Sequence, residues 1–198
     1  MKLRKSVITA LTTFTVLAIF AQVCFAFLLL TEDKGVAQMF PEGGDIKKIE
    51  HTLTDAEIAA VKGRLGGKFV HFQVGSKSAD VVAQSAYTFY VGSKDVAIIE
   101  EQPGKWGPVK FIIAIDATGK VTNLAVMEYK EKRGRPIARR NFLSQFVGKG
   151  SADPISVKSG KGIKRDIRSV SGATISSDCT CFAVKKAIAL YEEVYKKM

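Results

Sequence analysis

Residues 107–129 read GPVKFIIAIDATGKVTNLAVMEY. Two mostly apolar runs, Gly107–Asp116 and Val121–Tyr129, flank the polar tetrapeptide Ala117-Thr118-Gly119-Lys120. β-Branched and aromatic residues favour strands, and a short Gly-containing segment between two such runs is typical of a β-hairpin. We therefore predict a β-hairpin at the centre of a sheet.

Further elements are expected before this hairpin. Lys68–Val74 and Tyr87–Val91 are rich in aromatic and β-branched residues, which indicates two more strands. Ahead of them, Thr54-Asp55-Ala56-Glu57 is a capping box, in which the threonine hydroxyl and the glutamate carboxylate accept hydrogen bonds from each other's backbone N–H groups. The helix that starts there is expected to end at Gly66-Gly67, because glycine readily ends helices.

Two helices are expected after the hairpin. The first is Arg140–Val147, whose inward side chains should be Phe142, Leu143, Phe146 and Val147. Residues 149–170 are rich in Gly, Ser and Lys and are expected to run over the surface. The second helix is Ser177–Lys197, with one apolar face formed by Val184, Ile188, Tyr191 and Tyr195. The whole pattern predicts an α+β fold, a twisted and mainly antiparallel sheet with flanking helices.

The N-terminal part of the chain contains a long uncharged run. Val7–Leu30 reads VITALTTFTVLAIFAQVCFAFLLL. A membrane-spanning helix needs about 20 apolar residues, whereas the apolar core of a signal peptide usually has roughly 7–15. Residues 7–30 are therefore expected to form one N-terminal transmembrane helix that anchors the chain in a lipid bilayer.

The flanking charges predict how this anchor is oriented. Lys2, Arg4 and Lys5 precede the apolar run, and positive charge stays on the cytoplasmic side of a membrane. The expected organisation is a cytoplasmic N-terminus with the anchor at 1–30, a linker at 31–52 and an extracytoplasmic domain at 53–198. The expected location is the cell membrane, with a single membrane pass.

The chain is strongly basic, with a formal net charge of +11 and local clusters at Lys130–Arg140 and Lys158–Arg168. A basic surface suits nucleic acid, anionic lipid headgroups or an acidic protein. Because the domain is expected outside the cytoplasm, we expect no nucleic acid partner and favour the headgroups and the acidic protein.

The residue types that usually carry catalysis are sparse. His51 and His71 have no metal-ligand pattern around them, and each is expected at the surface or at an edge. Cys179 and Cys181 are two residues apart and would point in different directions on a helix, so no disulfide between them is expected. With no nucleophile–base pair, metal cluster or paired carboxylates in view, we predict no catalytic residue, no metal site and no stand-alone enzyme.

The most informative motif is SGATISS, residues 171–177. Small side chains let a ligand approach the backbone closely. Free N–H groups and the dipole at a helix N-terminus favour a phosphate there. The alternative is an ordinary helix start capped by Ser176 or Ser177. From these residues alone, both interpretations remain open.

SGAT followed by ISS and a C-terminal helix, behind a single anchor, resembles the FMN-binding domain family. That family includes the G subunit of Rnf-type ferredoxin:NAD oxidoreductases and the C subunit of sodium-translocating NADH:quinone reductases. The resemblance covers roughly Lys68–Met198. It is also visible in the hairpin turn and in RGRP…FLSQFVGK, within residues 133–149.

The resemblance implies a covalent cofactor. It implies that FMN is joined to Thr174 by a phosphoester and that a separate flavin transferase installs it. It also implies that the cofactor, rather than the protein, carries the redox chemistry. The residues expected around the cofactor are Ser171, Gly172, Ala173, Ile175 and Ser176.

The loop after the hairpin differs from the pattern of the Rnf and sodium-pump subunits, since it reads KEKRGRP at residues 130–136. Arg133, Gly134 and Arg135 are candidate cofactor-binding residues, because a positive charge near the flavin would stabilise its reduced anion. The alternative is a solvated charge run that docks a partner or lipid. Arg168 stands where the family usually has an acidic residue. Trp106 is expected either to stack on the flavin or to lie in the core.

Taken together, these features predict a membrane-anchored electron-transfer flavoprotein that relays electrons within or beside an Rnf-like or Nqr-like membrane redox complex. Its expected partners are the other subunits of that complex and the flavin transferase. The alternative is a non-redox binding or assembly module outside the cytoplasm that holds a phosphorylated ligand non-covalently.

Overall fold

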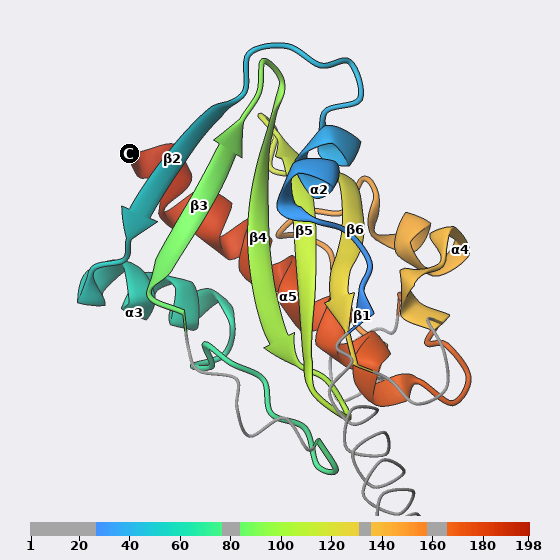
Figure 1. The fold of residues 1–198 in the computed structure, drawn as a ribbon. Coiled ribbons are helices and arrows are strands. Elements are labelled where there is room, and N and C mark those ends of the chain that lie inside the picture. The colour runs from blue at the N-terminus through green and yellow to red at the C-terminus, as the bar shows by residue number, and fades with distance from the viewer. Residues whose placement is uncertain (1–26, 77–83, 131–135, 158–165) are drawn as a thin grey trace, which may run out of the picture.

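A computed structural model describes residues 27–76, 84–130, 136–157 and 166–198. Its centre is a six-stranded antiparallel sheet with the strand order β1-β6-β5-β4-β3-β2 (Figure 1). The strands are β1 (Phe27–Leu28), β2 (Lys47–Thr52), β3 (Ala86–Val91), β4 (Asp95–Pro103), β5 (Pro108–Asp116) and β6 (Val121–Tyr129). The predicted α+β class and the antiparallel sheet with flanking helices are confirmed.

Helices cover both faces of this sheet. They are α2 (Glu32–Met39), α3 (Asp55–Arg64), α4 (Arg140–Leu143) and α5 (Thr174–Glu193), with short 3-10 turns η1 (Pro136–Ala138), η2 (Ser144–Phe146) and η3 (Tyr195–Lys197). Figure 1 shows α5 crossing one face of the sheet and α2 lying on the other. The buried apolar side chains accordingly form a large cluster under α5 and a smaller one under α2.

The predicted hairpin is confirmed as β5 and β6, which pair from Val109↔Tyr129 to Ile115↔Val121. Ile113 belongs to the core cluster under α5 and Ile112 to the cluster under α2. Both faces of β5 are therefore buried, which explains why its sequence is an apolar run and does not alternate. In the turn, the Asp116 carboxylate accepts hydrogen bonds from the Thr118 and Lys120 N–H groups, and Gly119 adopts a φ of 84°.

The predicted capping box is confirmed at the start of α3. The Glu57 N–H donates to Thr54 Oγ1 at 3.3 Å, and the Thr54 N–H donates to Glu57 Oε2 at 2.7 Å. At the other end, Gly66 and Gly67 have φ values of 63° and 82°, a region that favours glycine. This helix thus begins and ends where local chemistry predicts.

The segment 31–52, expected to be a linker, carries α2 and β2. The side of α2 that bears Gly35 and Met39 is buried on the sheet, and a Cβ added at Gly35 would lie 3.4 Å from Met127 and 3.5 Å from Ile112. β2 pairs with β3 along its whole length. Packing against a distant hairpin orders this segment, and local sequence contains no sign of that contact.

The strands differ from the prediction in two further respects. Lys68–Val74 is not a strand, although Phe69 is buried, and the His71 N–H donates to the side chain of Gln102 at 3.1 Å. β4 was not predicted, because Glu100, Glu101 and Gln102 interrupt its apolar residues. In the folded chain, Glu100 and Gln102 are fully buried with polar partners.

The region after the hairpin is more deeply packed than expected. Ile155, Val157 and Ile167 join the core, so residues 149–157 and 166–170 do not simply run over the surface. Phe142, Leu143 and Phe146 are buried as predicted, whereas Val147 is half exposed because the chain leaves the 3-10 turn before it.

The predicted anchor lies mostly outside the described residues. Within the described part of the chain, no helix is long and apolar enough to cross a membrane. The end of the apolar run, Phe27–Leu30, forms β1 and continues along β6, where the Leu29 and Leu30 N–H groups both donate to the Met127 carbonyl. Phe27 and Leu28 therefore belong to the sheet, and Leu29 and Leu30 are bonded to β6.

Candidate functional site

The start of α5 is built by a tight turn and a buried serine. Gly172 has a φ of 75°, and the Ala173 N–H donates to the Val170 carbonyl at 3.0 Å, which closes the turn. The Ser177 hydroxyl donates to the Ala173 carbonyl at 2.9 Å and accepts from the Val170 N–H at 3.1 Å. Ser177 thus ties the turn to the first turn of the helix.

This arrangement corrects the alternative of an ordinary cap at Ser176 or Ser177. Ala173 is the N-cap residue and makes no side-chain cap hydrogen bond, and α5 begins at Thr174, earlier than predicted. The helix therefore includes residues 174–176, which were predicted to lie in a loop. Ser177, inside the helix, hydrogen-bonds to the backbone of Val170 and Ala173 ahead of it. Both serines therefore lie within α5.

The residues of SGATISS differ in their exposure. Ser171, Gly172 and Thr174 are exposed, Ile175 is half-buried, and Ala173 and Ser176 are buried. Thr174 thus presents its hydroxyl at the first position of a 20-residue helix. The first N–H groups of a helix have no acceptor within it, and its N-terminus carries partial positive charge, so the surroundings of Thr174 favour an anion such as phosphate.

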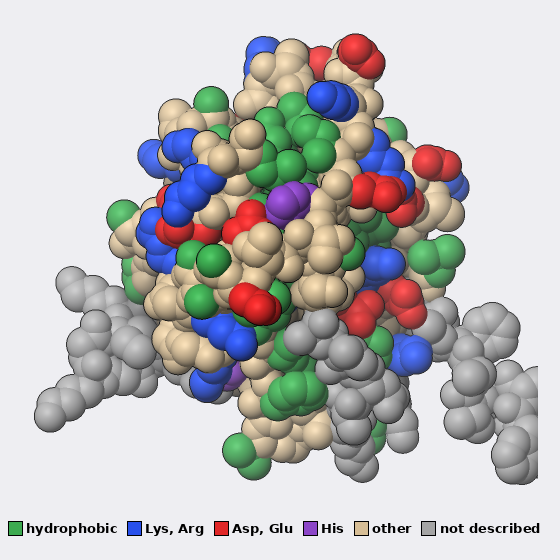
Figure 2. Space-filling view, turned by 90° about the vertical axis from the view of Figure 1, so that its left-hand side faces the viewer, with side chains coloured by type: hydrophobic (Ala, Val, Ile, Leu, Met, Phe, Trp, Pro, Cys, Tyr) green, Lys and Arg blue, Asp and Glu red, His purple; other side chains and the backbone are tan. Residues whose placement is uncertain are grey.

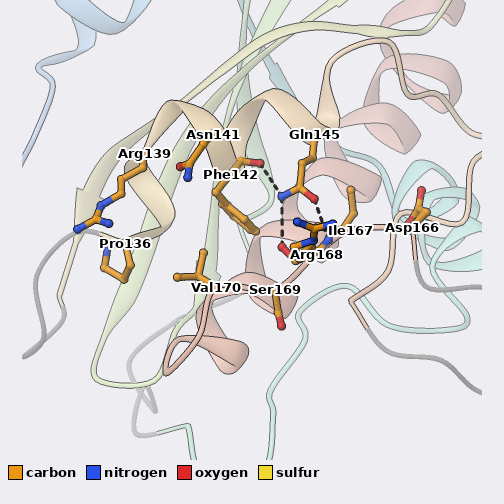
Figure 3. Close-up of a pocket in the computed structure, with 10 residues that line it drawn as sticks. All are labelled: Pro136, Arg139, Asn141, Phe142, Gln145, Asp166, Ile167, Arg168, Ser169 and Val170. Carbon is orange, nitrogen blue, oxygen red and sulfur yellow. Dashed lines mark hydrogen bonds between the residues drawn. The ribbon is translucent and has the colours of Figure 1, made fainter.

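A cleft of about 640 Å³ reaches Val170, the residue before SGATISS, while none of residues 171–177 lines it. One wall is formed by η1, α4 and η2, and the other by the segment that leads into the turn before α5 (Figure 3). Its lining residues are Pro136, Arg139, Asn141, Phe142, Gln145, Asp166, Ile167, Arg168, Ser169 and Val170. Val170 joins the cleft to Thr174, because it is held in the turn by Ala173 and Ser177.

Gln145 holds the two walls together. Its Oε1 accepts from the Arg168 N–H at 2.8 Å, and its Nε2 donates to the Arg168 carbonyl at 3.2 Å. The same Nε2 donates to the Phe142 carbonyl at 3.2 Å (Figure 3). A side-chain amide that satisfies both backbone groups of one residue fixes the separation of the walls.

Asp166 anchors the far end of the second wall. Its carboxylate accepts from the Ser156 N–H at 2.8 Å and lies 2.7 Å from Lys149 Nζ. Burial alone would raise the pKa of Asp166, but the bonds from Lys149 and from the backbone prevail and lower it. Asp166 is therefore ionised at neutral pH and is held by partners outside the cleft.

The cleft combines cations with apolar surface. Arg139 and Arg168 are exposed at its rim, while Phe142 and Ile167 are buried in its walls. Such a cleft suits a ligand that has an anionic group and a flat apolar part. Arg168, which stands where the family usually has an acidic residue, thus contributes positive charge to the cleft.

Other residues singled out in the sequence lie elsewhere. Arg133, Gly134 and Arg135 are outside the described residues, although Pro136, which follows them, lines the cleft. Trp106 is half-buried in the β4–β5 turn, where Lys105 Nζ lies 5.5 Å from the centre of its ring.

Sequence reasoning missed Arg139, Asn141 and Gln145 as lining residues. The sequence does indicate a shared polar face, since Asn141 and Gln145 are four residues apart and residues at that spacing lie on one face of a helix. The apolar residues of the same segment indicate only its buried side. Only the contact with residues 166–170 shows that the polar side forms a wall.

A second segment lies against the start of α5 on its other side. Gln73 Nε2 donates to the Ile175 carbonyl at 2.8 Å. His71 Nε2 lies 3.4 Å from the Asp178 carboxylate, and the His71 ring stacks on Phe182 at 5.1 Å between centres. The first three turns of α5 are thus contacted by His71 and Gln73.

Two similarities to known proteins cover this part of the chain. The family model of the FMN-binding domain matches residues 104–189, which include β5, β6, α4 and most of α5. The G subunit of the proton-translocating ferredoxin:NAD(+) oxidoreductase complex of Clostridium ljungdahlii is 28% identical over 106 residues. That alignment covers 52% of this chain and 57% of the relative, so the chain matches little more than half of that protein.

Proposed function

Residues 104–189 are a divergent FMN-binding domain, and from this premise we propose that the protein is a membrane-anchored electron-transfer flavoprotein carrying FMN covalently on Thr174. The observation that supports the attachment point is the exposed position of Thr174 at the first residue of α5, beside the cleft. Its hydroxyl is accessible, and a phosphate bonded to it would be at a helix N-terminus.

The residues present fit FMN. A cleft of about 640 Å³ is within the size range of cofactor sites. The start of α5 would favour the phosphate, Val170 offers apolar surface to the ring, and Arg139 and Arg168 add positive charge. Bound FMN supplies one- and two-electron redox chemistry, which no side chain of this cleft provides.

The other cofactor-binding residues remain part of the proposal. Ser171 and Gly172 are exposed in the turn, where small side chains leave room for a ligand. The remaining candidates in this group are Ala173, Ile175, Ser176, Arg133, Gly134 and Arg135. The role of the protein is to hold and tune the cofactor, so we propose an electron-carrier subunit and not a stand-alone catalyst.

The proposed partners follow from the relative and from the sequence. The relative is named as a subunit of a ferredoxin:NAD(+) oxidoreductase complex, which supports other subunits of a membrane redox complex as partners of this chain. We further propose a flavin transferase for maturation and an anchor in the predicted run 7–30, shortened to residues 7–26 because Phe27 and Leu28 form β1. The C-terminal domain then lies outside the cytoplasm.

The test is in-gel flavin fluorescence of the full chain co-expressed with a flavin transferase. We expect a fluorescent band after denaturation, and its complete loss in Thr174→Ala. Thr31→Ala is the matched control, because Thr31 is also exposed at a helix start but makes no side-chain cap hydrogen bond. A fluorescent Thr174→Ala band would exclude this attachment point. A dark wild-type band that still releases a phosphorylated ligand would favour the non-redox binding module.

A further inference from the structure

Four segments of the chain meet at one end of the molecule. Across the sheet, Phe27 pairs with Tyr129, Tyr129 with Val109, and Val109 with Gln102. This row lies next to the β4–β5 turn, so β1 begins at the end of the sheet where that turn is. The chain that precedes Phe27 therefore enters the fold here.

The loop of residues 71–76 and the start of α5 belong to the same end. The Ser76 hydroxyl donates to the carbonyl of Gly104 in the β4–β5 turn, and Gln73 donates to the carbonyl of Ile175 in α5. In Figure 1, this loop, the β4–β5 turn and the start of α5 all reach the lower end of the molecule. Thr174 lies at this end too, since it precedes Ile175.

Apolar side chains are exposed at this end. Among the described residues, the large hydrophobic side chains that are clearly exposed are Leu28 (62%), Phe72 (54%), Val74 (101%), Val147 (50%) and Met198 (58%). The first three belong to β1 and to the loop of 71–76. Figure 2 also shows hydrophobic side chains at the lower tip of the molecule. Phe72 and Val74 are exposed in the same short loop, and exposed apolar residues close together mark an interaction surface.

The residues around them suit the boundary between lipid and water. Trp106 and Lys105 lie half-buried in the β4–β5 turn, and the Lys130 side chain crosses the backbone of Gly107 in the same turn. Tryptophan is enriched at the level of the lipid headgroups, and lysine can place its stem on apolar surface while its amine stays in water.

We propose that this end of the domain, defined by Leu28, Phe72, Val74 and Trp106, rests in the headgroup region of the lipid bilayer. The uncharged run Val7–Leu30 enters β1 at Phe27 at this same end, so an anchored chain would bring these side chains to the membrane surface. The inference rests on the proposed anchor. It places Thr174 on the side of the domain that faces the membrane.

Trp106 is the only tryptophan of the chain and reports on this contact directly. The full chain, expressed without a flavin transferase, is reconstituted into phosphatidylcholine vesicles whose acyl chains carry bromine near the headgroups. We expect brominated lipid to lower the Trp106 emission by about twofold or more relative to unbrominated vesicles, because a tryptophan at this interface lies within reach of the quencher. Phe72→Ser with Val74→Ser should remove most of the quenching.

The matched control is Val147→Ser, which also replaces an exposed apolar residue. The next residue, Gly148, donates its N–H to the carbonyl of Val121, which begins β6, whereas Tyr129 ends that strand. Val147 therefore lies at the other end of β6, and this change should leave the quenching unaltered. Flotation of the vesicles separates the two hypotheses. Protein that floats but shows no quenching would overturn the membrane contact while keeping the anchor, whereas protein that does not float would overturn both.

Discussion

Lys186 and Glu100 form an ion pair inside the core, between α5 and β4. Lys186 Nζ lies 2.9 Å from Glu100 Oε1, and the two residues are 1% and 0% exposed. Gln102 Nε2 donates to the same oxygen at 2.6 Å, and the amine also lies 4.1 Å from the centre of the Phe69 ring. Burial raises the pKa of Glu100, while the charge of Lys186 acts in the opposite direction. Each charge is therefore stable in the core only because the other is present.

This pair leads to a prediction about stability. Lys186→Met leaves Glu100 buried without its cation and should lower the free energy of unfolding by about 3–5 kcal/mol. The double variant Glu100→Gln with Lys186→Met removes both charges and should recover most of that loss. Urea unfolding of the chain in mild detergent, followed by circular dichroism, measures both. A Lys186→Met loss below about 1 kcal/mol would show that the pair is not structurally important.

At the scale of elements, the two helix starts α2 and α3 form a natural comparison. Thr54 caps α3 through a complete capping box, whereas Thr31 occupies the same position of α2 without a side-chain cap hydrogen bond. Thr54→Ala should cost about 1 kcal/mol of unfolding free energy and Thr31→Ala only a few tenths. Equal losses in the same urea experiment would contradict the role of the capping box.

The capping box also gives a pH dependence. The bond from the Thr54 N–H, helped by the Thr54 hydroxyl and His51, lowers the pKa of Glu57. A lowered folded-state pKa contributes stability above the unfolded value of about 4.3, and this contribution is lost as the pH falls through the folded value. The stability of Glu57→Gln relative to wild type should therefore improve as the pH drops below about 4. A constant difference between the two proteins from pH 7 to pH 3 would contradict it.

At the scale of the whole molecule, the proposed orientation can be tested by thiol labelling. Cys179 and Cys181 are buried, and burial raises the pKa of the Cys181 thiol to about 12, so native protein should react very slowly with maleimides. Glu42→Cys introduces a thiol at a position whose native side chain is 80% exposed. In a Cys24→Ser background, a membrane-impermeant maleimide added to intact cells should label Glu42→Cys. The protein with Cys24→Ser alone should stay unlabelled. Labelling that requires cell lysis would place the domain in the cytoplasm.

Local patterns were sufficient for much of the fold. The hairpin, the α3 capping box and most of the C-terminal helix depend on residues close together in the chain, whose turn chemistry and periodicity act wherever they occur. The predicted single apolar face differs from the structure, since Thr180 and Lys186 of α5 are also buried and Tyr195 lies in η3. The SGATISS motif predicted a helix start nearby, but three residues too late, because the bonds of Ser177 that accompany the start of α5 at Thr174 cannot be read from the motif. The resemblance to the FMN-binding domain family could likewise be recognised from short motifs and was then shown for residues 104–189.

Tertiary contacts decided the rest. β4 forms despite its glutamates because Lys186 of α5 reaches Glu100, and α2 is ordered because Gly35 lets it lie close to β5 and β6. The cleft beside Thr174 exists because Gln145 joins two segments more than twenty residues apart in the chain. These features depend on pairs of residues that are distant in sequence, and a local pattern carries no information about which distant segment will satisfy a buried charge, cover an apolar face or complete a wall.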